Sequence, residues 1–213
     1  MDNSFYDDAK ESHRIEKIAE PILKELFSQI PDLFTDDNIV IFNIEEEKQK
    51  VLELLDRAYG YDYIVMNKTD NLGVAVSWKA IKCRHSQYPK SGVYNSFSLR
   101  YKRNNGTPEE NCELRKRQKA IESDALYPQF LAQAHYDPVN DDILSVAVAR
   151  TTDVYDAYDK GLFRDSNPNA RIEDKKAFFY EVMWELMKEE GYKVYDWYKD
   201  DSCRKTNYMG YKR

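Results

Sequence analysis

The chain has 213 residues, of which 42% are hydrophobic and 14% aromatic, and its 7 Gly and 7 Pro exclude a collagen-like or largely disordered protein. No stretch approaches the roughly 20 apolar residues of a transmembrane helix, and the first residues lack the basic and then apolar order of a secretory signal. The cysteines, Cys83, Cys112 and Cys203, form no CxxC pair and support neither a disulfide framework nor a zinc site. We therefore expect a soluble, cytoplasmic, globular protein.

Charge is distributed unevenly along the sequence. Residues 79–119 contain 11 Lys and Arg against 3 acids, a net charge of +8, whereas the whole chain carries -6. A basic block inside an acidic protein can face a polyanion such as nucleic acid, while the acidic remainder discourages nonspecific binding. The alternative is a solvated, lysine-rich helix beside a basic strand.

Hydrophobic periodicity predicts helices and strands in a defined order. Apolar side chains at helical spacing indicate a first helix over residues 7–29, which Pro21 is expected to kink or break. The elements expected next are a strand over 39–44, a helix over 45–60, a hairpin of strands over 61–67 and 73–82, a strand over 96–103, a helix over 109–123 and an extended segment over 127–136. The last third is expected to contain a strand over 143–151, helices over 152–163 and 171–191, and an aromatic tail from Tyr192.

Two short motifs lie within the helix, three strands, helix and strand that we expect between residues 45 and 136. Tyr61-Asp62-Tyr63 opens the first hairpin strand, and Ser77-Trp78-Lys79 lies in the second. In this order and in these motifs the chain resembles the PD-(D/E)XK nuclease superfamily. The αβββαβ core of that superfamily carries an Asp near the start of one strand, and an acid and a Lys, two residues apart, on the next.

The resemblance implies a mixed α/β (α+β) fold with a restriction-endonuclease-like core. It implies three regions, which are an N-terminal helical extension over 1–38, the nuclease-like core over 39–151, and C-terminal helices with the aromatic tail over 152–213. It also implies that Asp62 binds Mg²⁺ and that Lys79 orients the attacking water.

The sequence departs from the motif at Ser77, where the family has a second acid. A neutral hydroxyl is a poor Mg²⁺ ligand, so either a carboxylate from elsewhere completes the site or the site is inactive. By position, Glu113 on the following helix is the first substitute, and Glu53 on the preceding helix is the second. The structural alternative is that Asp62 caps a strand, that Lys79 is a surface lysine, and that Glu113 pairs with Arg117.

The basic block contains the candidate nucleic-acid contacts, which are Arg100, Lys102, Arg115, Lys116 and Lys119. Strand alternation predicts that Arg100 and Lys102 share one wet face, and Tyr101 can stack on a base. We expect the whole block to form one contiguous face. Alternatively, these cations only guard a strand edge against aggregation.

The histidines give little support for catalysis. His135 lies in an apolar run and is expected to be a packed core residue, while His13 and His85 have no acid or nucleophile at useful spacing. GxSxG, GxGxxG and GxxxxGK[ST] motifs are absent, which disfavours hydrolase triads and nucleotide-driven enzymes. The apolar positions of the segment 171–191 are expected to form core or a partner-binding face.

Two functions are consistent with these observations. The first is a metal-dependent, nuclease-like protein that binds or cleaves DNA, with Asp62 and Glu113 holding Mg²⁺ and Lys79 beside the water. The second is a catalytically inactive protein, similar to phage or mobile-element factors, that binds and inhibits a host protein. Ser77 favours the second function.

Overall fold

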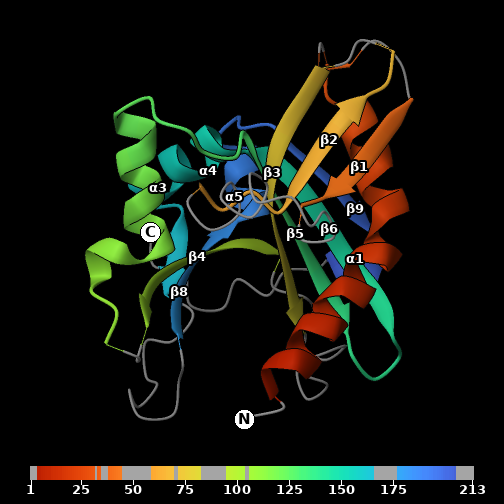
Figure 1. The fold of residues 1–213 in the computed structure, drawn as a ribbon, viewed down its shortest axis with the longest axis horizontal. Coiled ribbons are helices and arrows are strands. Elements are labelled where there is room, and N and C mark those ends of the chain that lie inside the picture. The colour runs from red at the N-terminus through yellow and green to blue at the C-terminus, as the bar shows by residue number, and fades with distance from the viewer. Residues whose placement is uncertain are drawn as a thin grey trace.

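Two β-sheets and their flanking helices make up the described part of the chain, shown as a computed structural model in Figure 1. The described residues are 4–31, 33–34, 38–44, 59–69, 72–82, 95–103, 106–165 and 177–204. The larger sheet has the strand order β1 (Ile39–Asn43), β2 (Tyr63–Asn67), β3 (Leu72–Lys82), β5 (Phe130–Asp137), β6 (Asp142–Arg150) and β9 (Val194–Tyr198). The smaller sheet has the order β4 (Ser96–Arg103), β8 (Ala177–Met183) and β7 (Phe163–Asp165). The helices are α1 (Ser4–Ser28), η1 (Glu109–Asn111), α3 (Glu113–Glu122), α4 (Thr151–Asp159), α5 (Trp184–Glu189) and α6 (Asp201–Arg204).

The larger sheet is mixed, which confirms the α/β class. β3 and β5 are parallel, and the other neighbouring strands are antiparallel. Parallel strands need a crossover connection, and here the connection contains β4 and α3. The crossover therefore brings β4 and α3 close to the β3 residues that were predicted to be functional.

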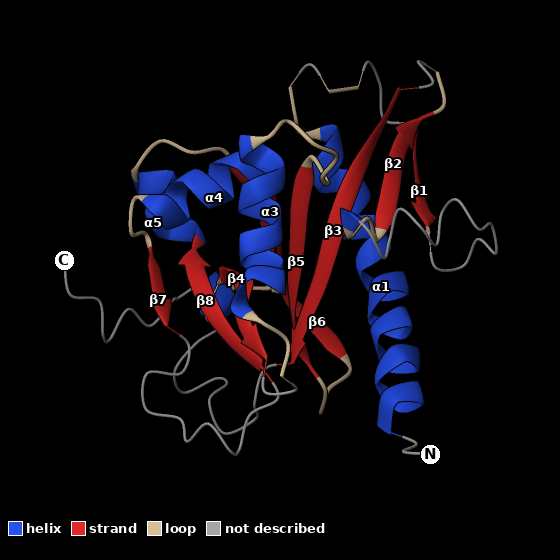
Figure 2. Cartoon of the chain, turned by 60° about the vertical axis from the view of Figure 1, so that its left-hand side comes forward, coloured by secondary structure: helices blue, strands red, loops and turns tan. Residues whose placement is uncertain are grey.

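The central strands of the larger sheet, β5 and β6, are buried on both faces. α1 covers one face, where Phe27 packs edge-on against Phe130 at 5.6 Å between ring centroids. The smaller sheet and helices α3, α4 and α5 lie on the opposite side, as Figure 2 shows. Successive β5 residues alternate between the two cores, with Phe130 toward α1 and Leu131 toward the smaller sheet.

Most predicted elements of the first two thirds of the chain are confirmed. β2 and β3 form the expected hairpin, and β6 matches the strand over 143–151. The expectation that Pro21 breaks the first helix is wrong, because α1 runs through Pro21 as one helix. The predicted helix over 45–60 lies outside the described residues except for its last two. The expected N-terminal helix, α1, packs on the larger sheet, because Ile15, Leu23 and neighbouring apolar residues belong to the same core as the sheet.

The last third differs from the prediction. The helix expected over 171–191 is wrong, because residues 177–183 form β8, and only 184–189 form a helix, α5. Phe178, Phe179 and Val182 favour a strand, and pairing with β4 on one side and β7 on the other overrides the helical spacing. Within the expected aromatic tail, Val194–Tyr198 form β9, while residues 205–213 lie outside the described structure. The expected helix over 152–163 ends at Asp159.

The third strand of the expected core also has a different position. β4 belongs to the smaller sheet, where it pairs with β8, instead of extending the hairpin of β2 and β3. β1 pairs with β2 in its place, so that β1, β2 and β3 form the antiparallel meander. Within the described ranges, no helix combines the length and apolar character that crossing a membrane requires.

Candidate functional site: a cationic cleft

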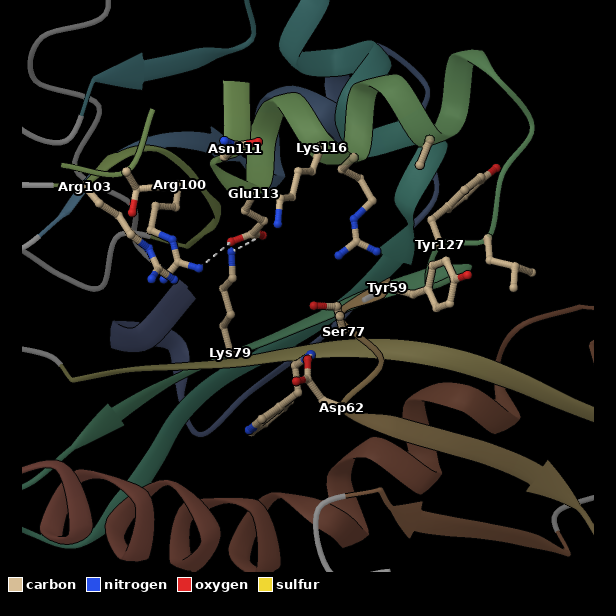
Figure 3. A pocket seen from close by; sticks show the side chains of 16 residues that line it. Tyr59, Asp62, Ser77, Lys79, Arg100, Arg103, Asn111, Glu113, Lys116 and Tyr127 are labelled. Carbon is tan, nitrogen blue, oxygen red and sulfur yellow. Dashed lines mark hydrogen bonds and ion pairs between the residues drawn. The ribbon is translucent and has the colours of Figure 1, made fainter. Parts of the chain in front are cut away.

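A cleft of about 690 Å³ lies where α3 and β4 approach β3 (Figure 3). Its described lining contains five cationic and two acidic side chains, which are Lys79, Arg100, Arg103, Lys116, Arg117, Asp62 and Glu113. The three residues predicted to be catalytic therefore line one cavity, although Asp62 lies just before β2, Lys79 in β3 and Glu113 in α3. Glu53, the other predicted metal ligand, lies outside the described residues.

Strand alternation on β3 determines which side chains enter the cleft. Val76 and Trp78 belong to the core cluster beside α1, although Trp78 also touches the cleft, and Ser77 and Lys79 line the cleft without belonging to that core. Lys79 Nζ reaches across to β4, where it donates a hydrogen bond of 2.5 Å to the carbonyl oxygen of Ser98. Lys79 is therefore an inward-facing residue with 23% of its side chain exposed, and the surface-lysine alternative is wrong.

Glu113 is the central carboxylate of the cleft. It lies in the first turn of α3, where the helix dipole stabilises a negative charge. Its Oε1 is 2.5 Å from Lys79 Nζ, and its Oε2 is 3.9 Å from Arg100 Nη2. Glu113 thus pairs with Lys79 and Arg100 and not with Arg117. Burial lowers the pKa of the Arg100 guanidinium, and the carboxylate of Glu113 opposes this shift.

Asp62 is held against the backbone of β3. Its Oδ2 accepts a 2.6 Å hydrogen bond from the backbone N–H of Trp78, and its own backbone N–H donates to Val76. Figure 3 shows Glu113 and Lys79 pointing toward one another, with Asp62 on the other side of the β3 ribbon in this view. The carboxylate of Asp62 therefore has the strand-capping contact of the structural alternative and also lines the cleft.

The described lining of the cleft offers two carboxylates to a metal, Asp62 and Glu113. Among the described residues, no group of three or more His, Cys, Asp or Glu side chains is arranged to hold a metal ion. Mg²⁺ usually binds through one or two carboxylates, and water and substrate phosphate supply the remaining oxygens. Asp62 and Glu113 fit that pattern only if Glu113 exchanges its contact with Lys79 for a contact with the metal.

The predicted nucleic-acid contacts are divided between two sides of α3 and β4. Arg100 and Lys116 line the cleft, whereas Lys102, Arg115 and Lys119 do not. Lys102 lies 3.7 Å from Glu109, and Arg115 donates to Gln118 on the exposed part of α3. The cleft therefore contains only part of the basic block, and one contiguous face over the whole block, of which residues 83–94 and 104–105 lie outside the described structure, stays a prediction.

A β-bulge explains why Arg100 and Lys102 separate. The register between β4 and β8 shifts between these two residues, so that alternation no longer places them on the same face. Arg103 lines the cleft instead of Lys102. Tyr101 is stacked on Tyr180 with ring centroids 4.1 Å apart, and this contact occupies the ring face that was predicted to bind a base.

Two cleft residues, Arg103 and Arg117, were not predicted from the sequence. Arg117 is only 7% exposed, and its Nη1 atom is buried without a hydrogen-bond partner in the described part of the chain. Burial raises the pKa of the nearby Tyr61 and Tyr155 hydroxyls, an effect that the positive charge of Arg117 opposes. Gly60 makes room for Arg117, since a Cβ at this position would lie 3.0 Å from Arg117 Nη2.

His135 is a core residue, as predicted. It is 3% exposed and packs edge-on against Trp184 at 5.4 Å between ring centroids. Burial lowers its pKa to about 4, while a hydrogen bond with the backbone of Ser96 opposes the shift. A neutral, buried imidazole outside the cleft lining is not placed to act there as a general base. The side chain of His13 and the whole of His85 lie outside the described structure.

The chain matches no protein-family model, no curated protein and no solved structure.

Proposed function

We propose that the protein binds the phosphate backbone of nucleic acid, with DNA as the expected partner, in the cleft between β3, β4 and α3. The observation that carries this proposal is the charge of the cleft, where five cations face two carboxylates in a chain of net charge -6. A concave, cationic surface concentrates a polyanion, while an acidic remainder repels it from other positions. We expect this activity in the cytoplasm.

The charges in the cleft are only partly neutralised from within. Glu113 contacts Lys79 and Arg100, which leaves Arg103, Lys116 and Arg117 without a carboxylate partner among the described ion pairs. These three cations approach the cleft from two elements, because Arg103 ends β4 while Lys116 and Arg117 belong to α3. A phosphate backbone in the cleft would contact both elements.

The proposal is tested by direct binding to short DNA and RNA oligomers at low salt. We expect Arg103→Gln and Lys116→Gln each to weaken binding roughly tenfold, as for the loss of one charge-assisted hydrogen bond. Lys119→Gln is the matched control, because Lys119 is exposed on the same helix but does not line the cleft. If the wild-type protein binds no nucleic acid at low salt, the proposal fails and the host-protein alternative gains support.

Metal-dependent cleavage is a second candidate function, favoured by the placement of Asp62, Lys79 and Glu113 in one cleft. Asp62 and Glu113 would hold Mg²⁺, which would supply a Lewis acid for the phosphate. Lys79 would donate a hydrogen bond to the phosphate or the attacking water.

Asp62→Asn tests the cleavage candidate. Asparagine keeps an oxygen that can accept the hydrogen bond from Trp78 but removes the charge that a hard cation requires. We expect Mg²⁺-dependent cleavage to fall steeply, with a change in the free energy of unfolding below about 1 kcal/mol. Retained cleavage together with a lowered melting temperature would show that Asp62 is structural.

A further inference from the structure

The two ends of the cleft differ in chemistry. Figure 3 shows Arg100, Arg103 and Asn111 at one end and the rings of Tyr59 and Tyr127 at the other. Lys79 and Glu113 lie between these ends. One end therefore offers cations and an amide to a phosphate, and the other offers aromatic surface to an apolar or aromatic group.

α3 sets the distance between the ends. Glu113 and Ala120 both line the cleft and are seven residues apart on the helix, which corresponds to about 10 Å along its axis. Leu126 and Tyr127 follow the end of the helix and line the cleft beyond Ala120. Leu126 is 57% exposed, so this end of the cleft presents apolar surface to solvent.

The tyrosine rings are partly exposed and are not fixed by hydrogen bonds. Within the described structure, neither the Tyr59 nor the Tyr127 hydroxyl makes a hydrogen bond, and both residues are of intermediate exposure. Among the described residues, Tyr59 has one ring neighbour, Tyr61, tilted by 46° at 6.0 Å between ring centroids. Tyr101, in contrast, is stacked on Tyr180 and does not line the cleft. Tyr59 and Tyr127 therefore keep ring surface that a planar group can cover.

We infer that the aromatic end of the cleft holds an unpaired base, and that the ligand of the cleft is single-stranded nucleic acid. This inference rests on the proposed function, because the cationic end must first bind the phosphates. In a duplex the base faces are already stacked, so an aromatic side chain can cover a base only where the strand is unpaired. Tyr59 and Tyr127 provide stacking surface, and Arg100, Arg103 and Lys116 provide the contacts to the backbone.

The test compares three probes at low salt, which are a short single-stranded DNA oligomer, an abasic oligomer of the same length and charge, and a blunt duplex. We expect the wild-type protein to bind the single strand most tightly. Tyr127→Ala should weaken binding to the single strand roughly 5- to 100-fold, the range for loss of one stacked base, and leave binding to the abasic oligomer unchanged. Tyr127→Phe keeps the ring and should bind like the wild type.

The outcomes separate this inference from the proposed function. Three outcomes would overturn the base site without contradicting phosphate binding in the cleft. They are equal affinity for the single strand and the abasic oligomer, tighter binding to the duplex, and an unaltered affinity of Tyr127→Ala for the single strand. Absence of binding to all three probes would overturn the proposed function, and the base site with it. Circular dichroism of each variant checks that a lost affinity is not a lost fold.

Discussion

Gly60 lies in the lining of the cleft, directly beside Arg117, the most buried cation of that lining. Its φ is +68°, a region that costs an L-residue of order 1 to 3 kcal/mol, and a Cβ there would also meet Arg117 Nη2 at 3.0 Å. We expect Gly60→Ala to lower the free energy of unfolding by about 1 to 3 kcal/mol and to weaken nucleic-acid binding. Chemical denaturation and binding titration measure the two effects.

Gly161 provides the matched control for Gly60. Its φ is +81°, but a Cβ there would meet nothing within 4 Å. Gly161→Ala should therefore show the backbone strain alone, with a smaller loss of stability and unchanged binding. If both substitutions alter binding equally, the contact between Gly60 and Arg117 has no role in the cleft.

The lowered pKa of His135 predicts that the free energy of unfolding depends on pH. Its pKa of about 4 in the folded protein lies below the ordinary value of 6.5, because burial disfavours the charged imidazole. Between these two values the unfolded chain takes up a proton that the folded protein does not. Stability should therefore be unaffected by this group above pH 6.5 and fall by up to about 3 kcal/mol as the pH decreases toward 4.

The contribution of His135 is separated from that of the carboxylates by comparison with His135→Leu, which cannot titrate. Denaturant titrations at pH 7 and pH 4.5 should give a smaller loss of stability for the variant than for the wild type. Parallel losses in both proteins would contradict a depressed pKa at His135.

The division of α3 into two sides could have been predicted from the sequence. Glu113, Lys116, Arg117 and Ala120 follow the i, i+3, i+4, i+7 spacing of one helical face, and all four line the cleft. The prediction placed Lys116 and Lys119 together because both are basic. Helical spacing instead places Lys119 outside the face that Lys116 shares with Glu113, Arg117 and Ala120. That Arg103 lines the cleft and Lys102 does not could not have been predicted, because the bulge in β4 depends on the pairing of β4 with β8.

At the scale of elements, hydrophobic periodicity predicted a helix where β8 is a strand. Phe178, Val182, Met183 and Met187 fit a helical stripe, but the first three lie in a strand and only the last lies in α5. Short amphipathic segments are ambiguous when strand partners are distant in the sequence, and β4 lies about 80 residues earlier. The hairpin of β2 and β3 was predictable because its partners are adjacent along the chain.

The pairing of β4 with β8 predicts a specific crosslink. Ser98 and Glu181 are register partners, and Ser98 Oγ is 2.8 Å from Glu181 Oε2. Directly opposed residues of antiparallel strands have Cβ atoms about 4.5 to 5.5 Å apart, close to the separation that a disulfide needs. We therefore expect the double variant Ser98→Cys and Glu181→Cys to form an intramolecular disulfide on mild oxidation.

The matched control shifts one cysteine by a single position. In the double variant Ser98→Cys and Val182→Cys, the two side chains lie on opposite faces of the sheet and should not crosslink. Peptide mapping identifies the linked cysteines and distinguishes them from the three native ones. Equal crosslinking in both variants would contradict the register of β8, and with it the position of Arg100 in the cleft.

At the scale of the whole molecule, the cleft results from packing against both faces of the larger sheet. α1 closes one face, so β4, β8 and α3 must pack on the other, and the crossover between β3 and β5 brings the basic block beside Lys79. The expected order of elements, through the family resemblance, predicted a mixed α/β class, and local patterns predicted most strands and helices of the first two thirds of the chain. The smaller sheet could not be predicted, because it pairs strands from the middle and the end of the chain.

The central claim is that the cleft binds a phosphate backbone by charge, and the salt dependence of binding tests it most directly. Log affinity for a single-stranded oligomer should fall linearly with log salt concentration, with a slope of about 0.7 for each phosphate contact. The double variant Arg103→Gln and Lys116→Gln should reduce the magnitude of this slope by roughly 1.4, whereas Lys119→Gln should leave it unchanged. Binding that is independent of salt, or a slope that changes as much in Lys119→Gln as in the double variant, would contradict the account.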